Sequence, residues 1–144
     1  MTPTPKLVWL IDDNEIDQRL YKRIIARASV DWQVQVFTFA EDALEVLKGQ
    51  PDRPVDLIFL DINMPRMNGF EFLEAAIADH GRGFARVVVA MLTTSLDPAD
   101  RRRAESYEVV KEFISKPLTV EIVQEADRRL ESDHWAAPPG EGQS

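Results

Sequence analysis

The feature that most constrains the fold is a set of almost continuous apolar runs that alternate with helical patterns along the chain. The runs LVWLI, VDLIFLD and VVVAML end at Ile11, Asp61 and Leu92. Strands that are apolar on both faces are typical of parallel sheets, because helices cover both faces of such a sheet. Two further strands are indicated at 33–39 and 110–115. The pattern therefore predicts an α/β domain of five β-α units around one parallel sheet.

Each predicted helix has a start signal or an apolar period between two strands. Asn14 is the expected N-cap of the first helix, and Ile16, Leu20 and Ile24 follow at the helical period. Further helices are expected at 41–48, at 70–78, from Asp97, and from Thr119 to about Leu130. The helix from Asp97 carries three arginines at 101–103, which we expect on a solvated face, with a protein contact as the second interpretation.

Size and composition exclude several classes of function for this protein. A chain of 144 residues is long enough for one domain with a sizeable core, expected over 6–131 between a short extension at 1–5 and a disordered tail at 132–144. The formal net charge of −8 argues against a nucleic-acid partner, and the lack of cysteine excludes disulfides and thiolate chemistry. The apolar run before Asp12 is too short for a signal peptide or a membrane span, so the cytoplasm is the expected location.

Polar side chains gather where the predicted parallel strands end. They are Asp12 and Asp13 after the first strand, Asp61 at the third, Thr93 after the fourth and Lys116 after the fifth. In open α/β sheets the ligand site lies beyond the carboxyl ends of the strands. Three neighbouring carboxylates need a cation to stay ionised, and oxygen ligands favour Mg²⁺ or Mn²⁺. The sequence therefore predicts a metal site suited to phosphoryl transfer, where one carboxylate could act as nucleophile.

Four segments, LIDDNEID, LIFLDINMPRMNG, MLTTS and FISKPL, resemble in order and spacing the receiver domain of two-component response regulators. The resemblance covers about residues 6–130. It implies a flavodoxin-like (βα)5 fold, a doubly wound parallel five-stranded sheet with strand order 2-1-3-4-5, for which the chemotaxis receiver is a familiar example. The Gly-Ala that usually precedes the fifth strand is replaced by SYEVVKEF, so the adjoining loop is expected to differ in shape.

The resemblance also implies roles for the residues at the strand ends. Asp61 would be the phosphoacceptor. Asp13 would bind Mg²⁺ (or Mn²⁺) directly, Asp12 through a water molecule, and Asn63 through its backbone carbonyl. Lys116 would pair with the phosphoryl group, held inward by a cis bond to the following proline.

Two further residues receive a switch role from the resemblance. Thr93 would be the switch hydroxyl, although the hydroxyls of TTS also suit an ordinary loop. Phe113 would be the switch aromatic, with a plain core position as the alternative. His80 and His134 are expected at the solvated surface, because this family carries its donor histidine on a separate kinase or phosphotransfer protein.

The expected function is that of a stand-alone receiver that is phosphorylated but performs no enzymatic turnover. Its partners would be a sensor histidine kinase or a histidine phosphotransfer protein, and a downstream protein bound by the fourth helix, fifth strand and last helix. A monomer or a weak homodimer is expected, and relay, phosphate-sink and effector roles stay open. The alternatives are a scaffold that docks without phosphorylation and an aspartate-nucleophile phosphatase. The latter would need a second aspartate where the chain has Asn63.

Overall fold

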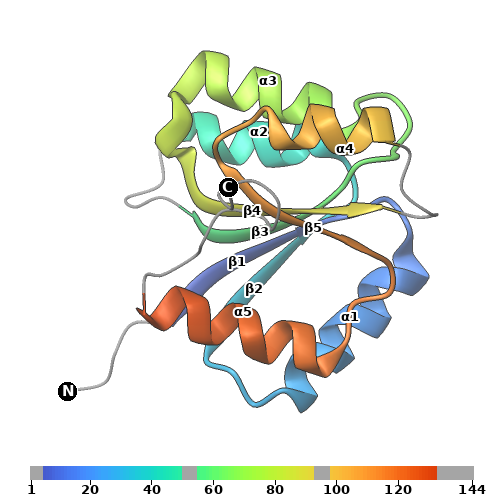
Figure 1. Ribbon diagram of the computed structural model, residues 1–144, viewed down its shortest axis with the longest axis vertical. Helices are drawn as coiled ribbons and strands as arrows, with labels where there is room; N and C mark the ends of the chain where they lie inside the picture. Colours follow the sequence, from blue (N-terminus) through green and yellow to red (C-terminus); the bar gives the residue numbers. More distant parts are fainter. Residues whose placement is uncertain (1–4, 50–54, 93–97, 133–144) are drawn as a thin grey trace.

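A computed structural model describes residues 5–49, 55–92 and 98–132 of the chain (Figure 1). Five parallel strands form one sheet in the order β2-β1-β3-β4-β5. The elements are β1 (Lys6–Ile11), α1 (Glu15–Arg27), β2 (Trp32–Phe37), α2 (Ala40–Lys48), β3 (Val55–Asp61), α3 (Gly69–His80), a 3-10 turn (Arg82–Phe84), β4 (Ala85–Leu92), α4 (Pro98–Glu105), β5 (Val110–Ser115) and α5 (Val120–Ser132). The predicted flavodoxin-like fold and its strand order are confirmed.

Helices cover both faces of the sheet. Figure 1 shows α1 and α5 on one side and α2, α3 and α4 on the other. Each side has its own apolar core, and the central strand β3 is buried at every position. Trp9 on β1 is 1% exposed and lies edge-on to Phe37, with the ring centroids 4.7 Å apart. The arrangement explains why the strands of this sequence are apolar on both faces.

The predicted apolar face of α1 is wrong. Ile16 and Leu20 are 74% and 39% exposed, whereas Tyr21 and Ile25 are buried in the core shared with α5. The helix has two sets of apolar residues at helical spacing, and these sets lie on different faces. The face that carries Tyr21 and Ile25 packs against the sheet. Ile24 lies at the edge of this core and is partly buried. The N-cap is as predicted, since Asn14 Oδ1 accepts a hydrogen bond from Asp17 N.

The three arginines of α4 are exposed, as the first interpretation predicted, and two of them also lie over aromatic rings. The guanidinium of Arg101 lies 4.5 Å from the ring centroid of Phe113, and that of Arg103 lies 4.4 Å from the ring centroid of Phe70. Of the residues of α4, only Ala104 is buried. Because a guanidinium stacks favourably on an aromatic face, these contacts attach a helix that has little apolar surface.

His80 also differs from the prediction of a solvated surface residue. It is the last residue of α3, is partly buried, and its Nε2 atom is buried without a hydrogen-bond partner in the described part of the chain. His134 lies outside the described residues. None of the helices within the described ranges is long and apolar enough to cross a membrane.

Candidate functional site

Three carboxylates meet at the carboxyl edge of the sheet. β1 and β3 are neighbours in register, with Ile11 opposite Leu60, so Asp12 and Asp61 leave adjacent strands at the same level. Asp12, Asp13 and Asp61 each offer an oxygen atom within 4.8 Å of the other two. Asp12 is 2% exposed and Asp61 is 1% exposed, so both charges lie in a poorly solvated position.

Backbone N–H groups orient the two buried carboxylates. Asn14 N donates to Asp12 Oδ1 over 2.9 Å, and Asn63 N donates to Asp61 Oδ1 over 3.2 Å. In each case the donor lies two residues after the aspartate, in the turn that leaves the strand. One oxygen of each carboxylate is therefore fixed by its own loop, and the other faces the neighbouring side chains.

The loop after Asp61 returns to the same strand end at Gly69. Gly69 N donates to the carbonyl oxygen of Ile62 over 3.0 Å. A Cβ atom at Gly69 would come within 2.8 Å of the Asp61 carbonyl oxygen and 2.9 Å of Ile62 Cα. Only a residue without a side chain allows this approach, so Gly69 helps to set the position of the Asp61 backbone.

Lys116 lies beside two of these carboxylates, in line with the resemblance. Its Nζ atom is 2.9 Å from Asp12 Oδ2 and 3.5 Å from Asp61 Oδ2, and its side chain is 12% exposed. The Lys116–Pro117 peptide bond is cis, as expected. A third carboxylate, Asp17 on the first turn of α1, contacts Nζ at 3.2 Å and was not singled out from the sequence.

The pKa values show a site with an excess of negative charge. Burial, followed by the charge of Asp12, raises the pKa of Asp61 to about 7. Burial also raises the pKa of Asp12, although the Asn14 N–H and the Lys116 ammonium oppose the shift. Burial alone would lower the pKa of Lys116, but Asp12 and Asp61 outweigh it and raise that pKa. One ammonium therefore does not compensate the carboxylates fully.

The donor set fits a hard divalent cation. All three candidate side chains supply carboxylate oxygens, which Mg²⁺ and Mn²⁺ prefer. Asp12 Oδ2 is buried and accepts no hydrogen bond from the described residues, so its charge is balanced only through the ion pair with Lys116. Asp13 is partly exposed and leaves the cluster accessible from solvent.

The roles predicted for the three remaining site residues are not tested by the described structure. Thr93 lies outside the described residues. Asn63 is exposed, and the ligand role of its carbonyl stays a prediction. Phe113 is partly buried on β5 and packs against the core beside α4, so its switch role also stays a prediction.

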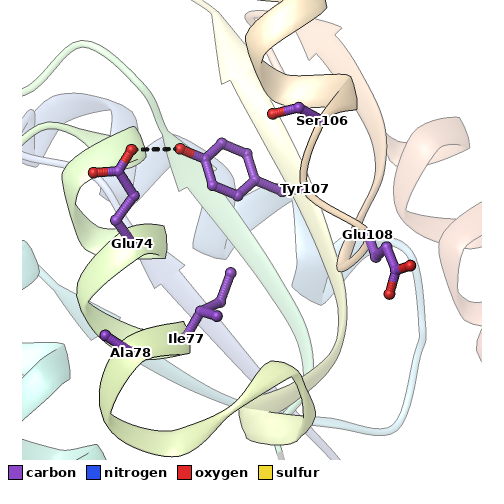
Figure 2. A pocket seen from close by; sticks show the side chains of 6 residues that line it. All are labelled: Glu74, Ile77, Ala78, Ser106, Tyr107 and Glu108. Atoms are coloured by element: carbon purple, nitrogen blue, oxygen red, sulfur yellow. Dashed lines mark hydrogen bonds between the residues drawn. The ribbon is translucent and has the colours of Figure 1, made fainter.

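A separate cavity of about 330 Å³ lies between α3 and the segment that follows α4 (Figure 2). It is lined by Glu74, Ile77, Ala78, Ser106, Tyr107 and Glu108. Figure 2 shows the Tyr107 hydroxyl directed at Glu74, to which it donates over 2.8 Å, and Arg103 also binds this carboxylate. None of the strand-end aspartates lines the cavity, so it is not part of the acidic site.

Comparison with known proteins agrees with the geometry. The family model of the response regulator receiver domain matches residues 8–127. Response regulator Rcp1 of Synechocystis sp. is 30% identical over 101 residues, which are 67% of this chain and 67% of that protein. The probable chemotaxis protein CheY of Rhizobium etli is 28% identical over 126 residues, covering 88% of this chain and 93% of that protein.

Other relatives are much longer, and a solved structure has the same fold. Hybrid signal transduction histidine kinase E of Dictyostelium discoideum is 35% identical over 72 residues, 49% of this chain but only 4% of the kinase. The crystal structure of a two-component response regulator from Cytophaga hutchinsonii superposes with a TM-score of 0.78 at 27% identity, covering 90% of this chain and 99% of that one. With its fold, its acidic strand ends and its matched residues, the chain belongs to the response regulator receiver domain family.

Proposed function

We propose that this chain is a phosphorylation-controlled signalling protein that accepts a phosphoryl group on Asp61 in the presence of Mg²⁺. The observation that carries the proposal is the convergence of Asp12, Asp13, Asp61 and Lys116 at one edge of the sheet. A scaffold that docks partners without phosphorylation does not require three carboxylates and an ammonium in contact. The arrangement costs folding free energy through repulsion and desolvation, so a role in binding charge accounts for it.

The chemistry follows from the positions of the side chains. An Asp61 carboxylate oxygen attacks the phosphorus atom of a phosphohistidine or of a small phosphodonor, and the bond from phosphorus to the leaving group breaks. Asp13 and Asp61, with Asp12 beside them, would hold the metal, which would neutralise charge on the transferred oxygens. Lys116 binds one of those oxygens, because its ammonium already lies 3.5 Å from Asp61 Oδ2.

Asp61 must be ionised to act as the nucleophile. In the metal-free site its pKa of about 7 leaves a substantial protonated fraction near neutrality. A divalent cation next to the carboxylate favours the ionised form and lowers that pKa. We therefore expect the reaction to depend on the metal both for charge neutralisation and for the protonation state of Asp61.

The partners are part of the proposal. A sensor histidine kinase or a histidine phosphotransfer protein would donate the phosphoryl group, in stoichiometric amounts and without turnover of other substrates. The signal would pass to a downstream protein through a contact made by the receiver surface. The cytoplasm remains the expected location from the sequence.

An aspartate-nucleophile phosphatase is disfavoured because Asn63, rather than an aspartate, follows Asp61 by two residues.

The test is phosphorylation by acetyl phosphate with Mg²⁺, followed by intact-mass measurement and peptide mapping. We expect one phosphoryl group, on Asp61, and none in Asp61→Asn or without divalent cation. The control is Asp79→Asn, which changes an exposed aspartate. Asp56 is unsuitable as a control because it accepts a hydrogen bond from Leu7 N and forms an ion pair with Arg86. Modification that persists in Asp61→Asn, or maps to another residue, would contradict the proposal.

A further inference from the structure

Lys116 has a carboxylate partner that does not belong to the acidic cluster. Asp17 Oδ2 accepts a hydrogen bond from Lys116 Nζ over 3.2 Å, although the two residues are separated by 99 positions in the chain. Asp17 lies on the first turn of α1, whereas Lys116 lies in the connection from β5 to α5. The pair therefore joins two segments that are far apart in the sequence.

The position of Asp17 is set independently of Lys116. Its backbone N donates to Asn14 Oδ1 over 3.0 Å, which fixes the first turn of α1. The next residue, Gln18, donates through Nε2 to the carbonyl oxygen of Asp12 and to Thr38 Oγ1. This turn is thus attached to the end of β1, and the Asp17 carboxylate is presented to the site by a fixed helix start.

The ammonium of Lys116 has three N–H donors and three carboxylate neighbours. Its Nζ lies 2.9 Å from Asp12, 3.2 Å from Asp17 and 3.5 Å from Asp61. Only the longest of these contacts involves the residue that would be modified. A donor released from Asp61 can turn to a phosphoryl oxygen while the other two carboxylates keep the ammonium in place.

We propose that Asp17 is a positioning residue for phosphoryl transfer, which holds the Lys116 ammonium beside Asp61 together with Asp12. The inference rests on the proposed function of Asp61. Lysine has a flexible four-carbon side chain, so an ammonium with a single fixed partner would sample other orientations. Asp12 alone is a weak anchor during the reaction, because its charge is also drawn toward the metal. Asp17 stays available, since it is outside the set of candidate metal ligands.

The first measurement observes the contact without any phosphorylation. In ¹⁵N-labelled protein the Lys116 NH₃⁺ resonance, identified by its loss in Lys116→Met, should be visible because its 12%-exposed side chain is held by carboxylates. Asp17→Asn should shift or broaden it. Glu15→Gln should leave it unchanged, because Glu15 is an exposed acid on the same helical turn and the substitution removes the same charge. An unaltered resonance in Asp17→Asn would overturn the proposal.

The second measurement separates positioning from an ion pair that only attaches the helix. With acetyl phosphate at saturating Mg²⁺, Asp17→Asn should lower the maximal rate of Asp61 phosphorylation about two- to fivefold, the effect of losing one partly exposed ion pair. The acetyl phosphate concentration that gives half of the maximal rate should be the same in Asp17→Asn as in wild type and Glu15→Gln. Asp17→Glu should recover part of the rate, because it restores a carboxylate.

The two measurements together give a distinct result for each explanation. A shifted lysine resonance with a maximal rate equal to that of Glu15→Gln would mean a purely structural ion pair and would overturn the positioning role. Melting curves exclude a folding defect as the cause of a slower rate. Wild-type protein that accepts no phosphoryl group would overturn the proposed function and this inference with it, while the resonance would still report whether Asp17 holds Lys116.

Discussion

Arg101 lies over the ring of Phe113, with its Cζ atom 4.5 Å from the ring centroid. The contact joins α4 to β5, two elements of the surface that receivers are expected to use for output. α4 has only one buried residue, Ala104, so this contact is a substantial part of its attachment. If Phe113 is the switch aromatic that the resemblance implies, Arg101 stabilises the partly exposed position of its ring.

A double-mutant cycle tests the contact. Arg101→Ala should lower the free energy of unfolding by about 0.5–1 kcal/mol beyond its effect in a Phe113→Leu background. The cycle removes the contribution of the Arg101–Glu105 ion pair, which is lost equally in both backgrounds. Urea unfolding measures the four proteins, and Arg102→Ala on the same helix is the control. A coupling energy near zero would mean that the stacked arrangement does not contribute to stability.

The sequence was sufficient for the sheet and for most of the site, for identifiable reasons. Strand ends in a parallel sheet share one edge, so the acids that follow β1 and β3 had to meet, as Asp12 and Asp61 do. Helix faces were harder to predict. In α1 two overlapping apolar periods compete, and the burial of Tyr21 rather than Ile16 depends on packing against the sheet and α5.

Contacts made by charged side chains between distant segments were not predictable from local patterns. Asp17 follows the N-cap Asn14 by three residues, a position where an acid favours the helix start by itself, so nothing in the sequence links it to Lys116. Likewise, three adjacent arginines on an acidic protein are typical of a solvated face. Only the placement of α4 against β5 and α3 brings Phe113 and Phe70 under two of them.

Gly69→Ala should destabilise the fold and disturb the site. The added Cβ would meet the Asp61 carbonyl oxygen at 2.8 Å and Ile62 Cα at 2.9 Å, and neither backbone atom can yield without moving the strand end. We expect a loss of about 1–3 kcal/mol in the free energy of unfolding, the usual cost of overpacking. Mg²⁺ affinity should fall as well, since the Asp61 backbone shifts.

Gly83→Ala is the matched control for this substitution. A Cβ at Gly83 would meet no atom within 4 Å, so it should change neither stability nor Mg²⁺ affinity appreciably. Chemical denaturation and a Mg²⁺ titration compare the two variants. Equal stability of Gly69→Ala and wild type would show that the strand end can adjust to the added atom.

The stability of the metal-free protein should fall as the pH rises from about 4 to about 7. Burial raises the pKa of Asp61 from 3.8 to about 7 and also raises that of Asp12, so the folded state binds protons more tightly than the unfolded state. Stability from these groups is present at low pH and is lost as pH passes through their folded pKa values. The raised pKa of Lys116 lies above this range and adds no slope within it.

Melting temperatures in chelator across this pH range measure the effect. Asp61→Asn should have a shallower pH dependence than wild type, because it removes the titrating group with the larger shift. Mg²⁺ should flatten the wild-type curve by stabilising the ionised carboxylates, with the largest stabilisation at the high end of the range. A metal-free melting temperature that rises steadily between these pH values would be inconsistent with the raised pKa of Asp61.

Lys116→Met should separate metal binding from phosphoryl transfer. The ammonium lies 2.9 Å from Asp12 Oδ2 and 3.5 Å from Asp61 Oδ2, where it competes with a divalent cation for the same oxygens. Methionine is uncharged and of similar length, so the substitution removes this competition. Among the described residues, no other lysine pairs with Asp12 or Asp61. We therefore expect tighter Mg²⁺ binding, seen as a larger rise in melting temperature per unit of added Mg²⁺.

The same variant should phosphorylate more slowly, because the transferred oxygens lose a cation that pairs with them during the reaction. In enzymes, loss of one hydrogen-bond donor that stabilises a developing negative charge costs about 10²–10³ in rate, and we expect a decrease toward that range with acetyl phosphate at saturating Mg²⁺. Lys111→Met, which replaces a partly buried lysine on β5, should behave as wild type in both assays. Weaker Mg²⁺ binding in Lys116→Met would instead mean that the lysine supports the metal site, with its contact to Asp12 orienting that carboxylate for the cation.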